Sequence, residues 1–153
     1  MYKQINKKKE ERIEQIIEGD YLSTALGTID QDNYPLVTKI IPMYLNQNIY
    51  LLMSDLSEHT KNICINNKVC IYFFLREKKK QKANNERLSI TGKLEKLKYK
   101  KNSKEFILLM KQYQSVEIGS QLWSNFSDFN FYNFQPQKLL FIEGFGKAYN
   151  KIY

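Results

Sequence analysis

The sequence has few of the residues on which several protein classes depend. Its 153 residues include only two cysteines, three prolines, one tryptophan and one histidine. The two cysteines, Cys64 and Cys70, are too few for a disulfide framework and lack metal-ligand spacing. The single histidine, His59, excludes a histidine-rich metal site and would be the sole base available to a serine–histidine–aspartate triad. We therefore expect a cytoplasmic protein, kept in a reducing compartment, with no metal site.

Long hydrophobic runs are also absent from the sequence. Mean hydropathy is −0.54, and no apolar segment approaches the roughly 20 residues that a membrane span requires. Residues 1–19 contain basic side chains but no apolar core of the kind found in signal peptides. The sequence therefore predicts neither a membrane span nor a secretory leader.

What the sequence does contain is enough apolar material for one folded core. Apolar residues make up 42% of the chain and aromatic residues 14%, a composition that argues against disorder. The length suits a single domain. We expect residues 1–19 to supply an N-terminal helix and residues 20–153 to form the rest of that domain.

The basic character of the chain is local. The net charge is +8, but residues 76–104 hold 12 of the 24 basic side chains and 3 of the 16 acidic ones. The centre of this segment, Lys78–Asn85, is typical of a solvated loop. The aromatic pattern with which RNA-binding strands stack on bases does not occur in the predicted strands. A nucleic-acid-binding or other cofactor-free binding module is therefore kept only as an alternative interpretation, one that would use this basic segment.

Hydrophobic periodicity predicts several short strands interrupted by helices. Helices are expected at residues 3–18, 57–66 and 103–114, with a shorter one near Trp123, and strands at 21–29, 36–44, 49–54, 69–75, 87–95, 128–134 and 138–149. Six or seven strands with short turns favour a closed or nearly closed antiparallel β-barrel with flanking helices, an α+β fold, because closure removes exposed strand edges.

Residues 53–62 are the most informative segment for function. They run from the end of a predicted strand into the first turn of a predicted helix, where free N–H groups favour an anion. Ser54, Ser57 and Thr60 add hydroxyl groups and Lys61 adds a positive charge. The pattern indicates a phosphate or carboxylate site, and the alternative is an ordinary serine N-cap followed by surface residues.

Four further residues are candidates for contact with a ligand. His59 would ligate a metal or haem, transfer a proton or donate to a phosphate, or else lie in solvent without a role. Arg87 begins an alternating strand and would hold an anion or polarise a ring carbonyl, or else be solvated. Thr38 and Lys39 share a strand, so one of the two faces away from the core.

Taken together, these segments resemble the flavin-type split-barrel superfamily related to pyridoxamine 5′-phosphate oxidase. Within it, the chain is similar to the haem-utilisation (HugZ-type) group. The resemblance covers most of residues 21–149, and its most specific parts are the HTKN element at residues 59–62 and the terminal DF…P…GFGKA pattern. It implies a six-stranded antiparallel split barrel of the FMN-binding type.

The resemblance also implies a homodimer with two equivalent cofactor sites between the barrels. By position it assigns cofactor binding to Thr38, Ser54, Ser57, His59, Thr60, Lys61 and Arg87. We expect the cofactor to be FMN and the protein to be an FMN-dependent oxidoreductase. Haem binding or haem degradation is the alternative; haem-degrading members use an axial histidine after the GFG strand, and no histidine follows Gly146 here. No residue is assigned as a catalytic acid or base.

Overall fold

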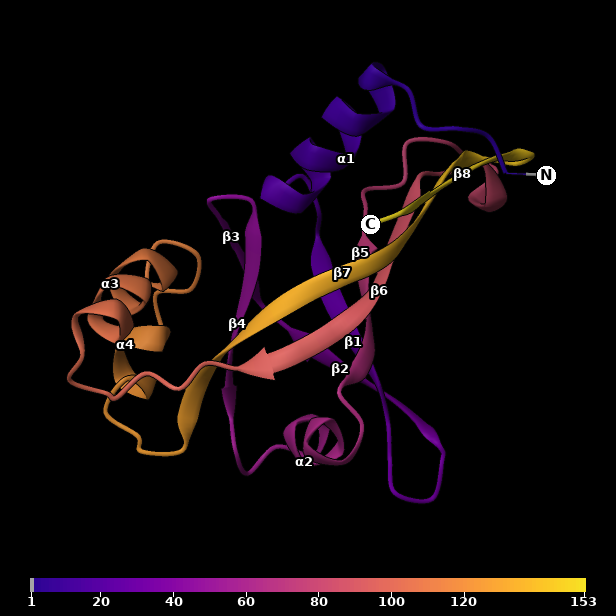
Figure 1. The fold of residues 1–153 in the computed structure, drawn as a ribbon. Helices are drawn as coiled ribbons and strands as arrows, with labels where there is room; N and C mark the ends of the chain where they lie inside the picture. Colours follow the sequence, from indigo (N-terminus) through magenta and orange to yellow (C-terminus); the bar gives the residue numbers. More distant parts are fainter. Residues whose placement is uncertain (1) are drawn as a thin grey trace.

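The computed structural model describes residues 2–153, which form a curled antiparallel sheet with helices at both ends and on one side (Figure 1). The strands are β1 (Ser23–Ile29), β2 (Pro35–Ile40), β3 (Pro42–Leu45), β4 (Asn48–Ser54), β5 (Lys68–Phe74), β6 (Arg87–Lys96), β7 (Phe129–Gly144) and β8 (Lys147–Ile152). The helices are α1 (Lys7–Glu18), α2 (Glu58–Ile65), α3 (Lys104–Tyr113) and α4 (Ser120–Trp123), with a short 3₁₀ turn at Lys82–Asn84. The predicted barrel with flanking helices is confirmed.

The two edge strands of the sheet are consecutive in the sequence, so the sheet curls into a nearly closed barrel. Its strand order is β2-β1-β5-β6-β7-β4-β3, so β2 and β3 lie at opposite edges. Only Ile41 separates these two strands in the sequence. The predicted strand 36–44 is therefore two strands, because Pro42 cannot donate to the ladder that β2 forms with β1.

Strand β7 joins the strands β2-β1-β5-β6 on one side of it to β4 and β3 on the other. It pairs with β6 through Tyr132–Ile142, with β4 through Phe129–Phe134, and with β8 through Lys138–Gly144. The predicted break between residues 134 and 138 is wrong, because β7 passes Pro136 as one 16-residue strand. A register shift beside Gly92 of β6 accommodates the proline.

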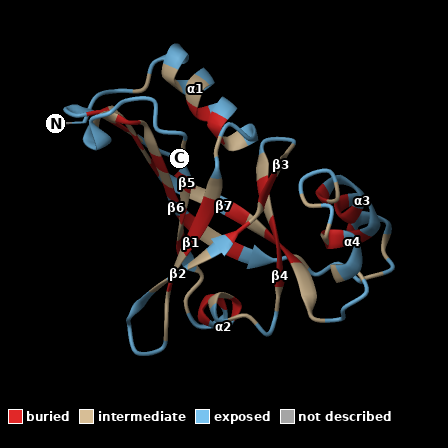
Figure 2. Ribbon diagram, turned by 180° about the vertical axis from the view of Figure 1, so that it is seen from behind, coloured by how far each residue is buried: buried red, intermediate tan, exposed pale blue. Residues whose placement is uncertain are grey.

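The core fills the lumen of the barrel. Inward side chains of β1, β4, β5, β6 and β7 form one buried cluster, seen as the red bands along the strands in Figure 2. Helix α2 closes one end of the barrel and α1 covers the other (Figure 1). A second, smaller cluster lies under α3 and contains Met43, Leu52 and Phe131. Among residues 2–153, no helix is long and apolar enough to cross a membrane.

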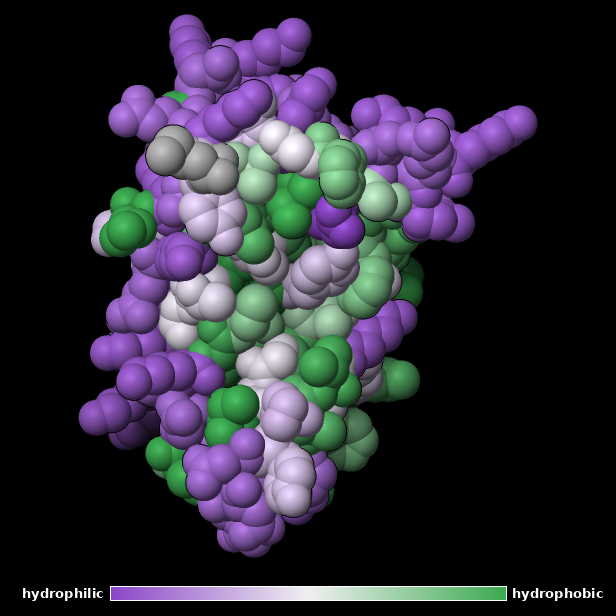
Figure 3. Space-filling view, turned by 90° about the vertical axis from the view of Figure 1, so that its right-hand side faces the viewer, coloured by the Kyte–Doolittle hydropathy of each residue, from purple (hydrophilic) through white to green (hydrophobic). Residues whose placement is uncertain are grey.

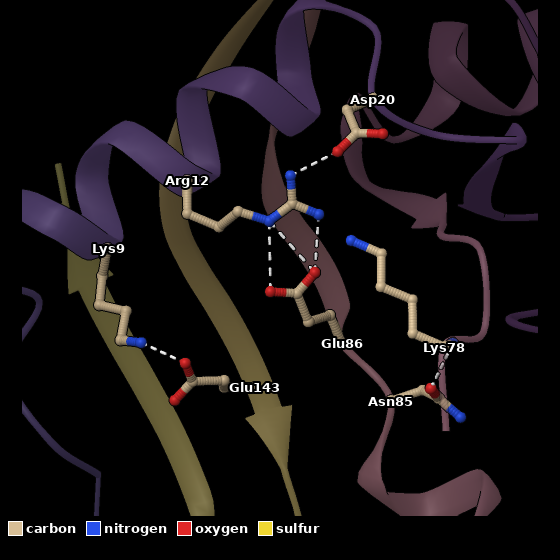
Figure 4. A network of polar contacts seen from close by, with 7 residues as sticks. All are labelled: Lys9, Arg12, Asp20, Lys78, Asn85, Glu86 and Glu143. Carbon is tan, nitrogen blue, oxygen red and sulfur yellow. Dashed lines mark hydrogen bonds and ion pairs between the residues drawn. The ribbon is translucent and has the colours of Figure 1, made fainter. Parts of the chain in front are cut away.

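Helix α1 is attached to the barrel by ion pairs as well as by its apolar face. Ile13 and Ile16 are buried. Arg12 contacts Glu86 and Asp20, and Lys9 contacts Glu143, as the dashed lines in Figure 4 show. The helix begins at Lys7 rather than at the predicted residue 3, because the Asn6 side chain accepts a hydrogen bond from the Lys9 N–H and caps it there.

The outer face of the sheet carries a partly exposed apolar patch on β2 and β5. Directly opposed residues on antiparallel strands share a face, so Val37, Gly27 and Cys70 lie on one side of the sheet. Their neighbour Leu26 lies on the other side and is fully buried, whereas Val37 is 67% exposed. Figure 3, seen from the side on which β5 and β6 lie in Figure 1, shows hydrophobic residues gathered along the middle of the face with hydrophilic residues around them.

Candidate functional site

A pocket of about 230 Å³ lies where β4 runs into α2. It is lined by the end of β2, by β4, and by residues from α3, α4 and the start of β7. The polar residues that line the pocket are Lys39, Ser54, Ser57 and His59, and its aromatic residues are Tyr113, Trp123 and Phe129. The structure therefore brings Ser54, Ser57 and His59, three of the seven residues assigned to cofactor binding, to one cavity with the further candidate Lys39.

His59 is held in place by a fourth predicted residue. Its Nδ1 shares a hydrogen bond of 2.9 Å with Thr38 Oγ1. The ring is half-buried, and loss of hydration lowers the pKa of His59 below its ordinary value of 6.5. Because Thr38 occupies Nδ1, Nε2 is the ring nitrogen left to contact a ligand.

Ser54 and Ser57 have different roles at this junction. Ser54 Oγ donates to the Asp128 carboxylate and accepts from the Leu56 N–H at 3.1 Å. These bonds join the end of β4 to the segment before β7. Ser57 stands at the N-cap of α2, but its side chain makes no capping bond. The Ser57 hydroxyl is thus the one free to meet a ligand.

The first turn of α2 offers two backbone donors. The N–H groups of Glu58 and His59 have no acceptor among residues 2–153. The charges of Lys61 and Glu58 neutralise each other, because the two side chains form an ion pair on the exposed side of the helix. The Thr60 side chain points inward, is 1% exposed, and its hydroxyl has no partner within the described residues.

Arg87 is not part of this pocket within one chain. It begins β6, whose other end, Lys96, contacts Asp55 at 2.9 Å beside the β4–α2 junction. Ten residues of strand separate the two ends by about 30 Å along its length. The Arg87 guanidinium instead donates to the Ala83 carbonyl at 3.4 Å. Its side chain alternates with the buried Leu88, so it faces the outer side of the sheet.

Residues from later in the chain complete the pocket, and the sequence marked Trp123 and Phe129 only as aromatic residues able to pack a flat ring. The rings of Trp123 and Phe129 are stacked, with centroids 5.5 Å apart and planes at 21°. The Tyr113 hydroxyl donates to the Ile41 carbonyl at 2.6 Å and so connects α3 to the β2–β3 link. Nothing in the spacing of these residues indicates contact with residues 53–62. The only signal is the aromatic content of residues 123–134, which predicts a surface that can pack a flat ring.

The carboxylates beside the pocket are already occupied. Asp55 accepts from Lys96 at 2.9 Å and from Asn130 at 2.9 Å, and Asp128 accepts from Ser54. In the described part of the chain, no group of three histidine, cysteine, aspartate or glutamate residues could hold a metal ion. The donors at this site therefore suit an anion with an attached aromatic group better than a cation.

Comparison with solved structures places the fold among split barrels. ChuZ of Campylobacter jejuni superposes with a TM-score of 0.84 at 21% identity, over 98% of this chain and 61% of ChuZ. HutZ of Vibrio cholerae, described as a heme storage protein, gives a TM-score of 0.71 at 21% identity, over 85% of this chain and 92% of HutZ. A Clostridium acetobutylicum protein related to general stress protein 26, of the pyridoxinephosphate oxidase family, gives a TM-score of 0.71 at 19% identity. The match covers 97% of this chain and 96% of that protein.

Some of these relatives are much longer than this chain, which spans 61% of ChuZ and 56% of the heme binding protein from Mycobacterium smegmatis. No curated protein matches the chain in sequence. The family model described as CREG, beta-barrel matches residues 23–152, from the start of β1 to the end of β8. The predicted resemblance to the split-barrel superfamily is thereby confirmed, and the chain belongs to the CREG beta-barrel family.

Proposed function

We propose that this protein is a homodimeric FMN-binding flavoprotein of the split-barrel type, with oxidoreductase activity. The observation that carries the proposal is the pocket at the β4–α2 junction, whose lining combines anion donors with a stacked pair of aromatic rings. A bound flavin would supply the hydride or electron chemistry. The chain itself would bind the cofactor, orient it and keep water from one of its faces.

The phosphate would lie at the start of α2. The free N–H groups of Glu58 and His59 and the uncapped Ser57 hydroxyl provide donors there. Lys39 lines the same pocket and contributes a positive charge. We assign the phosphate to these groups rather than to Thr60, Lys61 and Ser54. The Thr60 side chain is buried, Lys61 is paired with Glu58, and Ser54 is bonded to Asp128.

The pocket of one chain is small for a whole cofactor. Its volume of about 230 Å³ is below the ~300 Å³ at which ligand pockets usually begin. The partly exposed apolar face of the sheet, with Val37, Tyr72 and Phe74, supports a dimer that would add a second wall. Arg87 lies on this outer face, so in such a dimer it would approach the cofactor of the other chain.

Titration with FMN and riboflavin, followed by quenching of flavin fluorescence, tests the phosphate site. FMN should bind at least tenfold more tightly than riboflavin, since an ion-assisted phosphate contact contributes about 1.4 kcal/mol or more. Lys39→Gln should reduce that preference. The matched control is Lys68→Gln, which removes an exposed lysine from β5, away from the pocket. Equal affinities for the two flavins, or an equal effect of both variants, would contradict the assignment.

Haem is a second candidate ligand, and one contact favours it. Haem iron is often held by a histidine whose other ring nitrogen is hydrogen-bonded. His59 has this arrangement, with Nδ1 bonded to Thr38 and the ring lining a pocket with Trp123. The names of HutZ and the Mycobacterium smegmatis protein record haem storage or binding in structures of similar fold.

A haem titration followed by absorbance separates the two candidates. If His59 is the iron ligand, a Soret shift should saturate at one haem per chain in the wild-type protein and disappear in His59→Ala. If FMN binds as proposed above, the purified protein should retain it. Denaturation should then release a yellow chromophore with the mass of FMN. A Soret shift that persists in His59→Ala would exclude this histidine as the ligand.

A further inference from the structure

A second and larger cavity lies at the opposite end of the barrel from α2. It has a volume of about 520 Å³ and is bounded by α1, the β3–β4 turn and β8. It shares no lining residue with the pocket at the β4–α2 junction. A cavity of this size falls within the ~300–1,000 Å³ range of small-molecule sites. It is therefore large enough to hold a ligand independently of the proposed flavin site.

The floor of this cavity is the apolar interior of the barrel. Ile90, Phe134 and Leu139 are each at most 2% exposed and belong to the main core cluster. Ile13 and Ile17 of α1 form the roof. Such a lining favours the apolar or aromatic body of a ligand, because that body would leave water on entry.

The rim of the cavity carries unbalanced negative charge. Glu10 and Glu14 lie one helical turn apart on the side of α1 that faces the cavity. Glu10 is paired with Lys151 at 3.1 Å, whereas Glu14 forms no ion pair with any residue from 2 to 153. Burial, together with Glu14, raises the pKa of the Tyr44 hydroxyl at the same rim. This acidic rim stands out in a chain with a net charge of +8.

Helix α1 is held over the cavity by groups on its other side. Figure 4 shows Arg12 and Lys9 reaching from the helix to Glu86 and Glu143, with Arg12 also paired to Asp20. These contacts use Lys9 and Arg12, two of the four basic residues of α1, and Glu14 takes part in none of them. The cavity is thus preformed in the folded chain and needs no movement of the helix to exist.

We propose that this cavity binds a cationic amphiphile, a protonated amine attached to an apolar or aromatic body. The body would lie against Ile90, Phe134 and Leu139, and the ammonium group would lie at Glu14. An anionic amphiphile of the same size would place its charge beside Glu10 and Glu14, which disfavours it.

Calorimetric titration with 1-aminooctane, octanoate and 1-octanol at pH 7 tests the proposal. The three probes share one chain length and differ in charge. Octylammonium should bind saturably at one per chain, with 1-octanol weaker and octanoate weakest. Glu14→Gln should weaken octylammonium binding about threefold to fivefold, the size of one exposed ion pair. Glu11→Gln is the matched control, because Glu11 lies on the same helix but does not line the cavity.

Methyl NMR spectra place the bound probe. Octylammonium should shift the methyl signals of Ile13, Ile17 and Leu139, and circular dichroism should show that both glutamate variants fold. Binding of octanoate as tight as that of octylammonium would overturn the charge assignment. The absence of saturable octylammonium binding, or methyl shifts confined to other residues, would overturn the site itself.

Discussion

His59 is the residue at which the local environment has its clearest effect on chemistry. Half-burial removes water from the imidazole, and this loss of hydration lowers its pKa below 6.5. The hydrogen bond from Nδ1 to Thr38 fixes the ring in the pocket at the β4–α2 junction. At neutral pH the ring is therefore uncharged and able to accept a proton, a hydrogen bond or a metal at Nε2.

This environment predicts a measurable dependence of stability on pH. A histidine with a lowered pKa binds more protons when the chain is unfolded. The free energy of unfolding therefore increases with pH through the window between the folded pKa and 6.5, and it decreases when the pH falls through that window. Urea unfolding at several pH values should show a steeper acid loss for wild type than for His59→Gln. One proton limits the difference to about 1.4 kcal/mol per pH unit.

NMR titration gives an independent measurement of the same shift. His59 is the single histidine in the sequence, so its ring signals need no assignment. The folded protein should titrate below 6.5 and the protein in urea near 6.5. A folded value at or above the value in urea would show that the ring is not desolvated as the structure indicates.

Among the elements, the pairing of β6 with β7 depends on one glycine. At the register shift, a Cβ on Gly92 would lie 2.2 Å from the Gln135 carbonyl oxygen and 2.7 Å from the Phe134 ring. Phe134 is buried in the core and cannot swing into solvent. The local structure therefore requires a residue without a side chain at this point.

Gly92→Ala should lower the free energy of unfolding by about 2 kcal/mol or more, because overpacking of this kind shifts backbone or core side chains. Gly27→Ala is the matched control, since its added Cβ would make an ordinary contact at 3.6 Å with the Cys70 carbonyl oxygen. Chemical denaturation of both variants at one protein concentration measures the difference. Similar destabilisation by the two substitutions would mean that the bulge can relax.

The sequence predicted the elements better than their connections. Apolar patterns located most of the strands, because these signals are local, but the predicted strand 138–149 ran through the turn that separates β7 from β8. The continuity of β7 through Pro136 could not be predicted, since it depends on the bulge at Gly92 in another strand. For the same reason the N-terminal half of the pocket was predicted, whereas the position of Tyr113 and Trp123 beside it was not, because only the folded chain brings these rings to His59.

At the scale of the whole molecule, the exposed apolar patch on the outer side of β2 and β5 is the feature that bears on the proposed assembly. Val37 is 67% exposed, and the edge-to-face pair of Tyr72 and Phe74 lies on the same side of the sheet. An exposed apolar patch with polar residues around it usually marks an interaction site. The proposed cofactor site also needs a second wall, and a second copy of the chain would supply it from this face.

Sedimentation velocity tests this assembly. Wild type should sediment at twice the chain mass of 18.3 kDa, and Val37→Glu should shift it toward the monomer, because a carboxylate would be buried without a partner in the interface. Ile107→Glu is the control, since Ile107 is similarly exposed but lies on α3, outside the sheet face. Monomeric wild type, or equal dissociation by both variants, would reject the interface. If the dimer completes the flavin site, Val37→Glu should lose FMN affinity in parallel with dimerisation, whereas binding of 1-aminooctane under α1 should be unchanged.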